Sequence, residues 1–248
     1  IFSGIVARLP AAVGSTIELI KAQTLPIMLV FVLLILMAAV VWFIIYVETS
    51  QRKIPIQYAK RVVGRRVYGG QSSHLPLKIN VSGVIPPIFA SSIMMFPATI
   101  GTFVHIDWVQ KVTSALSPGT VWYYLMFVSL IVFFCFFYAA IMFKPDDVAE
   151  NLKKNGGFIP GIRPGKKTAE FLDKTLVRLT VIGAVYLSAV CVMPTLFVTK
   201  LNVPFHFGGT ALLIVVGVAI DTIAQIESHM IMRNYDGFMK AGRIQGRR

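Results

Sequence analysis

Few residues in this sequence could carry out chemistry, and those that could are scattered. Asp221 is an acid within an apolar stretch, and such an acid is by default a candidate functional group because charge is costly in lipid. It stands past the middle of that stretch, near its basic end, so we favour a structural role in which it snorkels towards water or pairs with an arginine. The histidines fall in or near different connections and cannot form a joint metal site; they are His74, His105, His206 and His229.

Catalytic motifs are absent from the sequence. It contains no Gly-x-Ser-x-Gly elbow, no His-Glu-x-x-His pair and no Walker loop. Cys135 and Cys191 both lie in apolar blocks, where they are typical small hydrophobic residues rather than a disulfide or a metal pair. We therefore predict a protein that is not an enzyme, with no catalytic residue, no metal site and no cofactor.

The composition is that of a membrane protein. Of the 248 residues, 56% are hydrophobic and only 14% are charged, against about 25% charged in soluble domains. The apolar residues come in blocks of about 20, which matches the thickness of a bilayer. We predict an all-α polytopic membrane protein whose membrane-spanning helices cover 25–47, 80–103, 120–143, 176–199 and 210–230.

Positive charge alternates along the connections between these helices. Segments 48–79 and 144–175 carry seven Lys or Arg each, and the tail 231–248 carries five, whereas 104–119 and 200–209 carry one each. The positive-inside rule explains this pattern and the net charge of +13 better than dedicated nucleic-acid binding does. We therefore expect the three basic segments, the C-terminus included, to lie in the cytoplasm.

The basic connections contain ordered motifs. Residues 57–68 alternate β-branched and basic residues around Gly64, which predicts a protruding hairpin. A short helix is expected after Pro145, and two Pro-Gly turns follow with Arg163 held between them. Such segments suit docking better than simple tethering, although solvated loops remain the alternative.

The span at 80–103 breaks the rules for a helix in lipid. It carries Pro86, Pro87 and Pro97, and each proline removes a backbone donor. Freed backbone groups cost several kcal/mol in lipid, roughly, unless protein or water satisfies them. The sequence therefore predicts that this helix borders a wet cavity or a moving interface; a kinked but static helix is the alternative.

Four motifs resemble the SecY family of bacterial protein-conducting channels, in the right order along essentially the whole chain. They are His74–Lys78, Gly83–Ser92, Phe158–Gly165 and Val203–Thr210. The resemblance implies a helical bundle made of two inverted-topology halves, of which this chain is one. It also implies that 1–24 holds the end of an earlier spanning helix and an external segment, so we expect further spans to precede Ile1.

The resemblance assigns functional residues by matching position. A ring of aliphatic side chains that closes the pore is implied at Ile1, Ile88 and Ile214. A lateral gate, through which a chain leaves sideways into lipid, is implied along the span at 80–103. Its matching residues are Asn80, Ile85, Pro86, Pro87, Ser91 and Ser92.

Docking sites and partners also follow from the resemblance. It implies that the ribosome, through its RNA and the proteins at its tunnel exit, and the SecA motor bind the two basic connections. The matching residues are Lys60, Arg65, Arg66, Lys78 and Arg163. SecE, SecG, a nascent or signal-bearing polypeptide and membrane lipid are the further partners that it implies, in the bacterial cytoplasmic (inner) membrane.

Two other functions are open from the residues alone. An ion-coupled secondary transporter would use Asp221 as its coupling site, and that residue would have to face a cavity at mid-membrane. An intramembrane hydrolase would need a second buried acid to pair with Asp221. The channel instead requires Ile88 and Ile214 to converge.

Overall fold

In the computed structural model, the described residues are 2–7, 10, 11, 14, 27–58, 61–63, 66–68, 72–103, 107–117, 119–201 and 209–241. The elements from residue 27 onward follow one another as α2 (Ile27–Thr49), β1 (Gln51–Tyr58), β2 (Arg61–Val63), β3 (Arg66–Tyr68), β4 (Ser72–Lys78), α3 (Ile85–Phe103), α4 (Asp107–Ala115), α5 (Val121–Met142), α6 (Pro145–Lys154), β5 (Gly157–Phe158), α7 (Lys166–Leu201) and α8 (Gly209–Ala241). The chain is thus mostly helical, and its strands lie in the connections.

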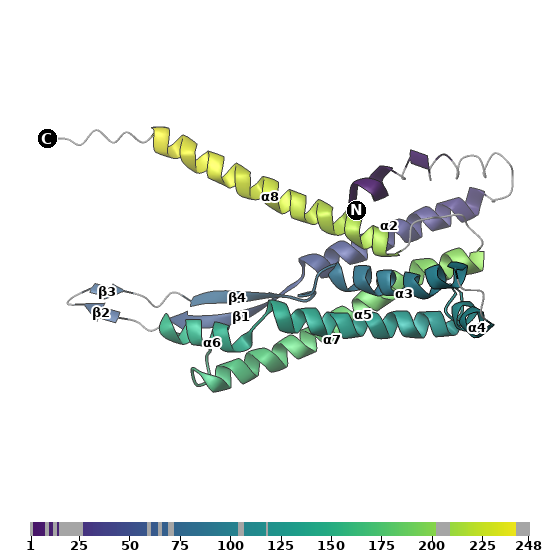
Figure 1. Ribbon diagram of the computed structural model, residues 1–248. Coiled ribbons are helices and arrows are strands. Elements are labelled where there is room, and N and C mark those ends of the chain that lie inside the picture. Colours follow the sequence, from purple (N-terminus) through teal and green to yellow (C-terminus); the bar gives the residue numbers. More distant parts are fainter. Residues whose placement is uncertain are drawn as a thin grey trace.

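Five long helices form a bundle with a small sheet at one end (Figure 1). Helix α5 packs against both α3 and α7, and the first half of α8 packs against α2 and α7. The strands and α6 lie at one end, which we call the sheet end, and the short helix α4 lies at the other. Helices α2, α5 and α8 run towards the sheet end, whereas α3 and α7 run away from it.

The helices have the length and composition of membrane spans. Among the described residues, three helical stretches are long and apolar enough to cross a bilayer: 121–154, 166–195 and 209–232. Two shorter apolar stretches lie in α2 and α3. Helix α2, with 23 residues, is about 34 Å long at 1.5 Å per residue, which also suffices. The chain is an all-α polytopic membrane protein.

One stripe of α5 forms the centre of the bundle. Its buried residues recur every four positions, at Phe127, Ile131, Cys135 and Ala139, so they lie on one helix face. All but Ala139 belong to a core to which every long helix contributes. The other buried members of that core are Ile44, Ala90, Met94, Ala184, Tyr186, Leu187, Val190, Cys191, Leu212, Leu213 and Val216. Both cysteines are buried and free, as expected for small apolar residues.

A second, smaller core joins the two basic connections at the sheet end. Strand β1 pairs antiparallel with β4 on one side and with β5 on the other. Ile54 of β1 and Leu77 of β4 are both buried, and they pack with Leu172 and Leu179 of α7. Segments separated by about 100 residues of sequence therefore form one unit. Strands β2 and β3 make a separate hairpin beyond it.

Helix boundaries differ from the predicted spans where a helix leaves the apolar block. Helix α7 begins at Lys166, well before the predicted start at 176, and α8 continues to Ala241 rather than 230. The extension of α7 is amphipathic, because it buries Ala169 and Leu172 while Glu170 and Asp173 stay exposed. Hydropathy locates the part of a helix in lipid, whereas packing at the sheet end decides where the helix starts.

Helix α8 is held mainly by its first turns. Leu212, Leu213 and Val216 are buried, whereas residues 221–232 are all exposed, and Figure 1 shows this part of α8 leaning away from the bundle. Gly209 makes the close approach possible: a Cβ atom there would collide with the Val190 carbonyl oxygen and lie 2.7 Å from the Cys191 Cα atom. Only glycine fits at this contact with α7.

We predict that Gly209→Ala destabilises the protein by roughly 1–3 kcal/mol, because the added methyl meets backbone that cannot move without shifting a helix. The free energy of unfolding in detergent measures this. Gly217→Ala is the control on the same helix, since its Cβ would meet only the flexible Val84 side chain at 3.3 Å. Equal losses from the two substitutions would contradict the packing described here.

Candidate functional site

The turn that precedes α3 is organised by one buried side chain. Asn80 is 4% exposed, and its Nδ2 atom donates to the Gly83 carbonyl at 3.1 Å and to Glu48 Oε1 at 2.7 Å. Its Oδ1 atom accepts from Ser82 Oγ at 3.2 Å. Gly83 has φ +65, a left-handed conformation that glycine adopts without strain. Asn80 therefore closes this turn and ties it to the end of α2.

The prolines of α3 act differently from the sequence-based expectation. Pro86 and Pro87 follow Ile85, the first residue of the helix, so they lie in the first turn, where backbone N–H groups have no intrahelical acceptor. Both are fully buried against neighbouring elements. Pro97 alone lies inside α3 and interrupts its hydrogen-bond ladder. The expectation that all three prolines weaken this helix was wrong, because two of them start it.

The two serines of α3 are satisfied within the helix. Ser91 Oγ and Ser92 Oγ both donate to the Ile88 carbonyl oxygen, at 2.9 and 2.8 Å. Ser/Thr hydroxyls in apolar helices commonly make such bonds to the preceding turn. Neither hydroxyl therefore needs water or a partner helix in this conformation.

The sides of α3 differ in their contacts. Ala90 and Met94 are buried in the core, and Phe89 packs on Phe134 and Tyr138 of α5 with ring centroids 5.7 and 5.8 Å apart. Further along, α3 carries an apolar surface that is exposed in the described part of the chain. Its exposed members are Ile93, Met95, Phe96, Ile100 and Phe103. One side of α3 is thus fixed to α5 while another remains available.

The start of α3 also touches α8. A Cβ atom at Gly217 would lie 3.3 Å from Val84 Cγ1, so the two segments are in contact at that level. The helices run in opposite directions (Figure 1). One turn beyond Val84 along α3 is Ile88, and one turn before Gly217 along α8 is Ile214. Both isoleucines therefore lie about one turn further from the sheet end than the Val84–Gly217 contact. Each is on the same face of its helix as the residue that makes this contact.

The two isoleucines are partly or well buried. Ile214 is 9% exposed, and Ile88 is half-buried. Ile85, at the start of α3, is half-buried as well. Ile1, the third residue of the predicted ring, lies outside the described residues. Convergence of the ring therefore stays a prediction, which the Val84–Gly217 contact makes geometrically reasonable.

Those predicted docking cations that the structure describes lie at the sheet end. Lys78 is the last residue of β4 and is exposed. Arg66 begins β3, in the small hairpin, but only its backbone is described. Lys60 and Arg65 lie outside the described residues. Because β1 and β5 pair, the described parts of the two basic connections share one end of the molecule.

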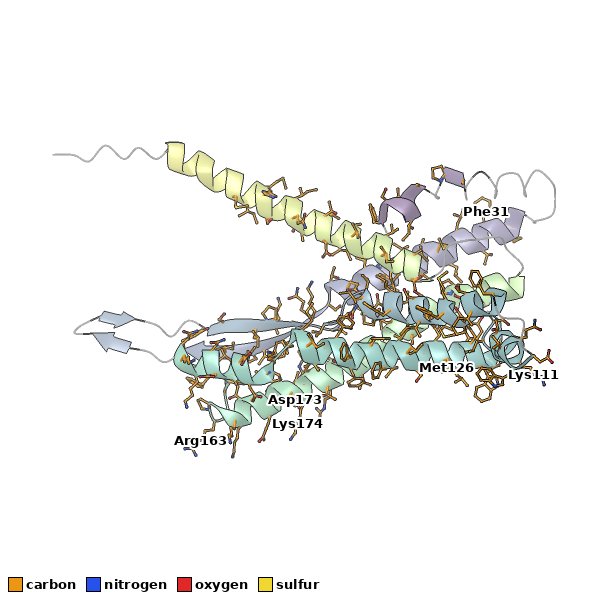
Figure 2. The ribbon with its side chains drawn as sticks, in the orientation of Figure 1. Phe31, Lys111, Met126, Arg163, Asp173 and Lys174 are labelled. Atoms are coloured by element: carbon orange, nitrogen blue, oxygen red, sulfur yellow. The ribbon has the colours of Figure 1, made fainter. Side chains whose placement is uncertain are left out.

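Arg163 has a fixed backbone and a free side chain. Its carbonyl accepts from Thr168 Oγ1 at 3.0 Å, and Gly161 and Gly165 on either side have φ +81 and +106. A bond of 3.1 Å from the Ile162 amide to the Ile159 carbonyl closes the turn before it. Figure 2 shows Arg163 projecting from this loop, at the opposite end of the molecule from Lys111. A rigid base with an exposed guanidinium suits binding to phosphate or carboxylate.

The other predicted ionisable residues bear on a possible metal site in the part of the chain that the structure describes. No group of three or more His, Cys, Asp or Glu there could hold a metal ion. His74 lies on β4 and His229 on the exposed part of α8, while His105 and His206 are outside the described residues. Asp221 is exposed on α8 rather than buried in a cavity.

Sequence reasoning missed Glu48. It stands in the last turn of α2, where the helix dipole disfavours a carboxylate, so it needs a hydrogen-bond donor. That donor is Asn80, 32 residues away. An acid at the C-terminal end of an apolar helix is the signal that could have drawn attention to this position.

Comparison with known proteins identifies the family. The SecY family model matches residues 1–223. Proteins named protein translocase subunit SecY are 48% identical in Pseudomonas aeruginosa and 46% identical in Escherichia coli, over 99% of this chain. The chain belongs to the SecY family. It spans 57% and 56% of the length of these two relatives.

Solved structures agree on the fold. Two of them match with a TM-score of 0.54 at 19% identity, and they cover 80% and 78% of this chain. The chain covers 49% and 48% of theirs, so it corresponds to about half of each. One is described as a study of how the plug domain of the SecY protein stabilises the closed translocation channel, and the other as the structure of a protein-conducting channel. The comparisons give no support to the transporter alternative built on Asp221.

Proposed function

We propose that this chain forms one half of a protein-conducting channel, which passes unfolded polypeptides across a membrane and releases membrane segments sideways into lipid. Membership of the SecY family supports this, together with relatives named as translocase subunits. Because the chain spans little more than half of those relatives, a complete pore requires the remainder of the family's fold. The channel itself is passive and carries out no catalytic chemistry.

The contact between α3 and α8 is the observation that carries the proposal. Because Ile88 and Ile214 each lie one turn from this contact on helices of opposite direction, we expect them to converge at one level. With Ile1 from an earlier helix, they would form an apolar constriction. Apolar walls exclude water and so block ions without a charged filter, whereas flexible aliphatic side chains yield to a passing polypeptide.

Helix α3 is proposed as the gate helix of this half. Its side towards α5 is packed, but its exposed apolar surface is free to meet a partner helix or lipid. The gate residues would act in different ways. Asn80 would fix the turn before α3, and Pro86 and Pro87 would begin the helix. Ile85 would border the interface with other elements. Ser91 and Ser92 would keep their hydrogen bonds to the Ile88 carbonyl oxygen while the gate moves.

The sheet end is proposed to face the cytoplasm of a bacterial cell, with the channel in the inner membrane and the C-terminus inside. Its cations suit the phosphates of ribosomal RNA and acidic surfaces of the SecA motor, which would supply the energy that the channel lacks. The residues proposed for docking are Lys60, Arg65, Arg66, Lys78 and Arg163. SecE and SecG are proposed as membrane partners by family resemblance.

Replacing Ile88 with asparagine is expected to raise ion conductance through the closed channel by about tenfold or more, because a polar side chain hydrates the constriction. Conductance of the complete translocase in planar lipid bilayers measures this. Ile88→Leu is the matched control and should leave the conductance low. If Ile88→Asn conducts no better than the control, Ile88 does not close the pore.

Reversing the charge at Arg163 is expected to slow motor-driven export by about tenfold, because its guanidinium is exposed on a rigid turn and available to a partner. The protein should still insert in the membrane. Transport of a secretory precursor into vesicles measures the effect, and Lys111→Glu, on exposed α4 at the opposite end, is the control. Normal export by Arg163→Glu would refute the docking role.

A further inference from the structure

Helix α4 differs from the long helices in its direction. Figure 1 shows it nearly end-on, whereas α3, α5 and α7 lie lengthwise in the same view, so α4 runs across the axis of the bundle. Helix α3 has 19 residues and is about 28 Å long, close to the ~30 Å thickness of the hydrocarbon layer of a bilayer. A helix of that length that crosses the layer ends at its surface. Helix α4 begins at Asp107, four residues after α3 ends at Phe103, and is therefore placed at that surface.

One face of α4 packs against the end of α3. A Cβ atom at Gly101 of α3 would lie 2.6 Å from Thr113 Oγ1 and 2.9 Å from Thr113 Cγ2, so glycine there lets the two helices touch. Thr113 Oγ1 also lies 3.3 Å from the carbonyl oxygen of Pro97, one turn earlier on α3. Val109, one turn before Thr113 on α4, is half-buried as well. Helix α4 is thus fixed to the part of α3 that follows its internal proline.

The rest of the surface of α4 has a polar side and an apolar side. At roughly 100° per residue, Gln110 and Ser114 share one side of the helix, and Trp108 and Ala115 share another. All four residues are exposed. The helix therefore presents one face to α3, a second that suits water and a third that carries a large aromatic ring. This division is typical of a short helix that lies in the plane of a membrane interface.

Exposed aromatic residues also lie at the neighbouring helix ends. Phe103 ends α3 and is 80% exposed, Trp108 is 72% exposed, and Trp122 in the first turn of α5 is 66% exposed. Trp is enriched where membrane meets water, because its ring is apolar while its N–H group needs a polar partner. The apolar side of α4 thus continues the lipid-exposed ends of two membrane helices. Its occupant should be the layer in which phospholipid headgroups meet their acyl chains.

We propose that α4 is an interfacial anchor, which lies among the phospholipid headgroups at the end of the bundle opposite the sheet end. The Trp108 ring inserts below the headgroups, while Gln110 and Ser114 face water. Because Thr113 packs on Gly101, the anchor also fixes the depth of the end of α3 in the bilayer. The anchor requires only that the chain spans a membrane, whereas its effect on a gate helix rests on the proposed function.

Spin labels on α4 test the anchor in the complete translocase, in vesicles of phosphatidylethanolamine and phosphatidylglycerol without a translocating polypeptide. Collisions with oxygen, which concentrates in lipid, and with a water-soluble nickel chelate show whether a label faces lipid or water. A label at Ala115 should favour oxygen, whereas a label at the adjacent Ser114 should favour nickel. Phe133, exposed in the middle of α5, is the reference position for the hydrocarbon layer. Equal nickel access at Ala115 and Ser114, or an Ala115 label that neither reagent reaches because protein covers it, would overturn the anchor.

Replacing Trp108 tests what holds α4 at this depth. Trp108→Ala should shift the Ala115 label towards water, so that most of its difference in oxygen access from Ser114 is lost. Trp122→Ala is the matched control, because Trp122 is similarly exposed but belongs to α5, and it should leave the Ala115 label unchanged. An Ala115 label that keeps its depth in Trp108→Ala would contradict the role of this ring.

A label at Ile100 of α3, which is 49% exposed, tests the link between the anchor and the gate helix. Trp108→Ala should move this label as well. Gly101→Leu, whose side chain displaces Thr113, should remove that effect. The link is wrong if the Ile100 label ignores Trp108→Ala, or if it responds equally in the Gly101→Leu background. If the unmodified translocase transports no polypeptide, the proposed function fails instead, and the depths of the α4 labels are unaffected.

Discussion

Every backbone and side-chain polar group of a helix in lipid must find a partner inside the protein, and the start of α3 is built around this constraint. Asn80 uses its amide to close a turn and to reach Glu48, while Pro86 and Pro87 occupy positions where a missing N–H costs nothing. The Asn80 and Ser82 side chains at the start of the helix thereby find partners within the protein. This leaves the helix anchored at its start and packed along only one side.

The same division between fixed and free surfaces runs through the rest of the molecule. The sheet end is stiff, because β1 joins two distant connections and a small core under it includes α7. Helix α8 is the opposite case: its first turns are packed tightly enough to require Gly209, whereas its residues 221–232 are exposed. A rigid sheet end and two helices with exposed apolar side chains fit the proposed channel half, which would have to bind a partner and also move.

Much of this could be predicted from the sequence. The apolar blocks predicted the long helices, and the four motifs indicated the family. Both signals can be recognised within short stretches of sequence. The prolines of α3 show the limit of prediction from sequence. All three were taken to interrupt the span, but the effect of a proline depends on whether it falls in the first turn of the helix. The hydrogen bond of Glu48 shows this limit of sequence-based prediction more clearly. Its partner Asn80 is 32 residues away, in a turn against which α7 packs closely. Periodicity and charge counts contain no information on such pairings.

The central claim is that a translocating polypeptide passes beside the contact between α3 and α8. Photo-crosslinking tests it most directly, with a photoreactive amino acid in place of Ile88 in the complete translocase and a polypeptide stalled during transport. The account predicts a crosslink from position 88 to the polypeptide, and none from position 131, which is buried on α5. Crosslinks from position 88 to lipid alone, or only to this chain's own helices, would contradict it.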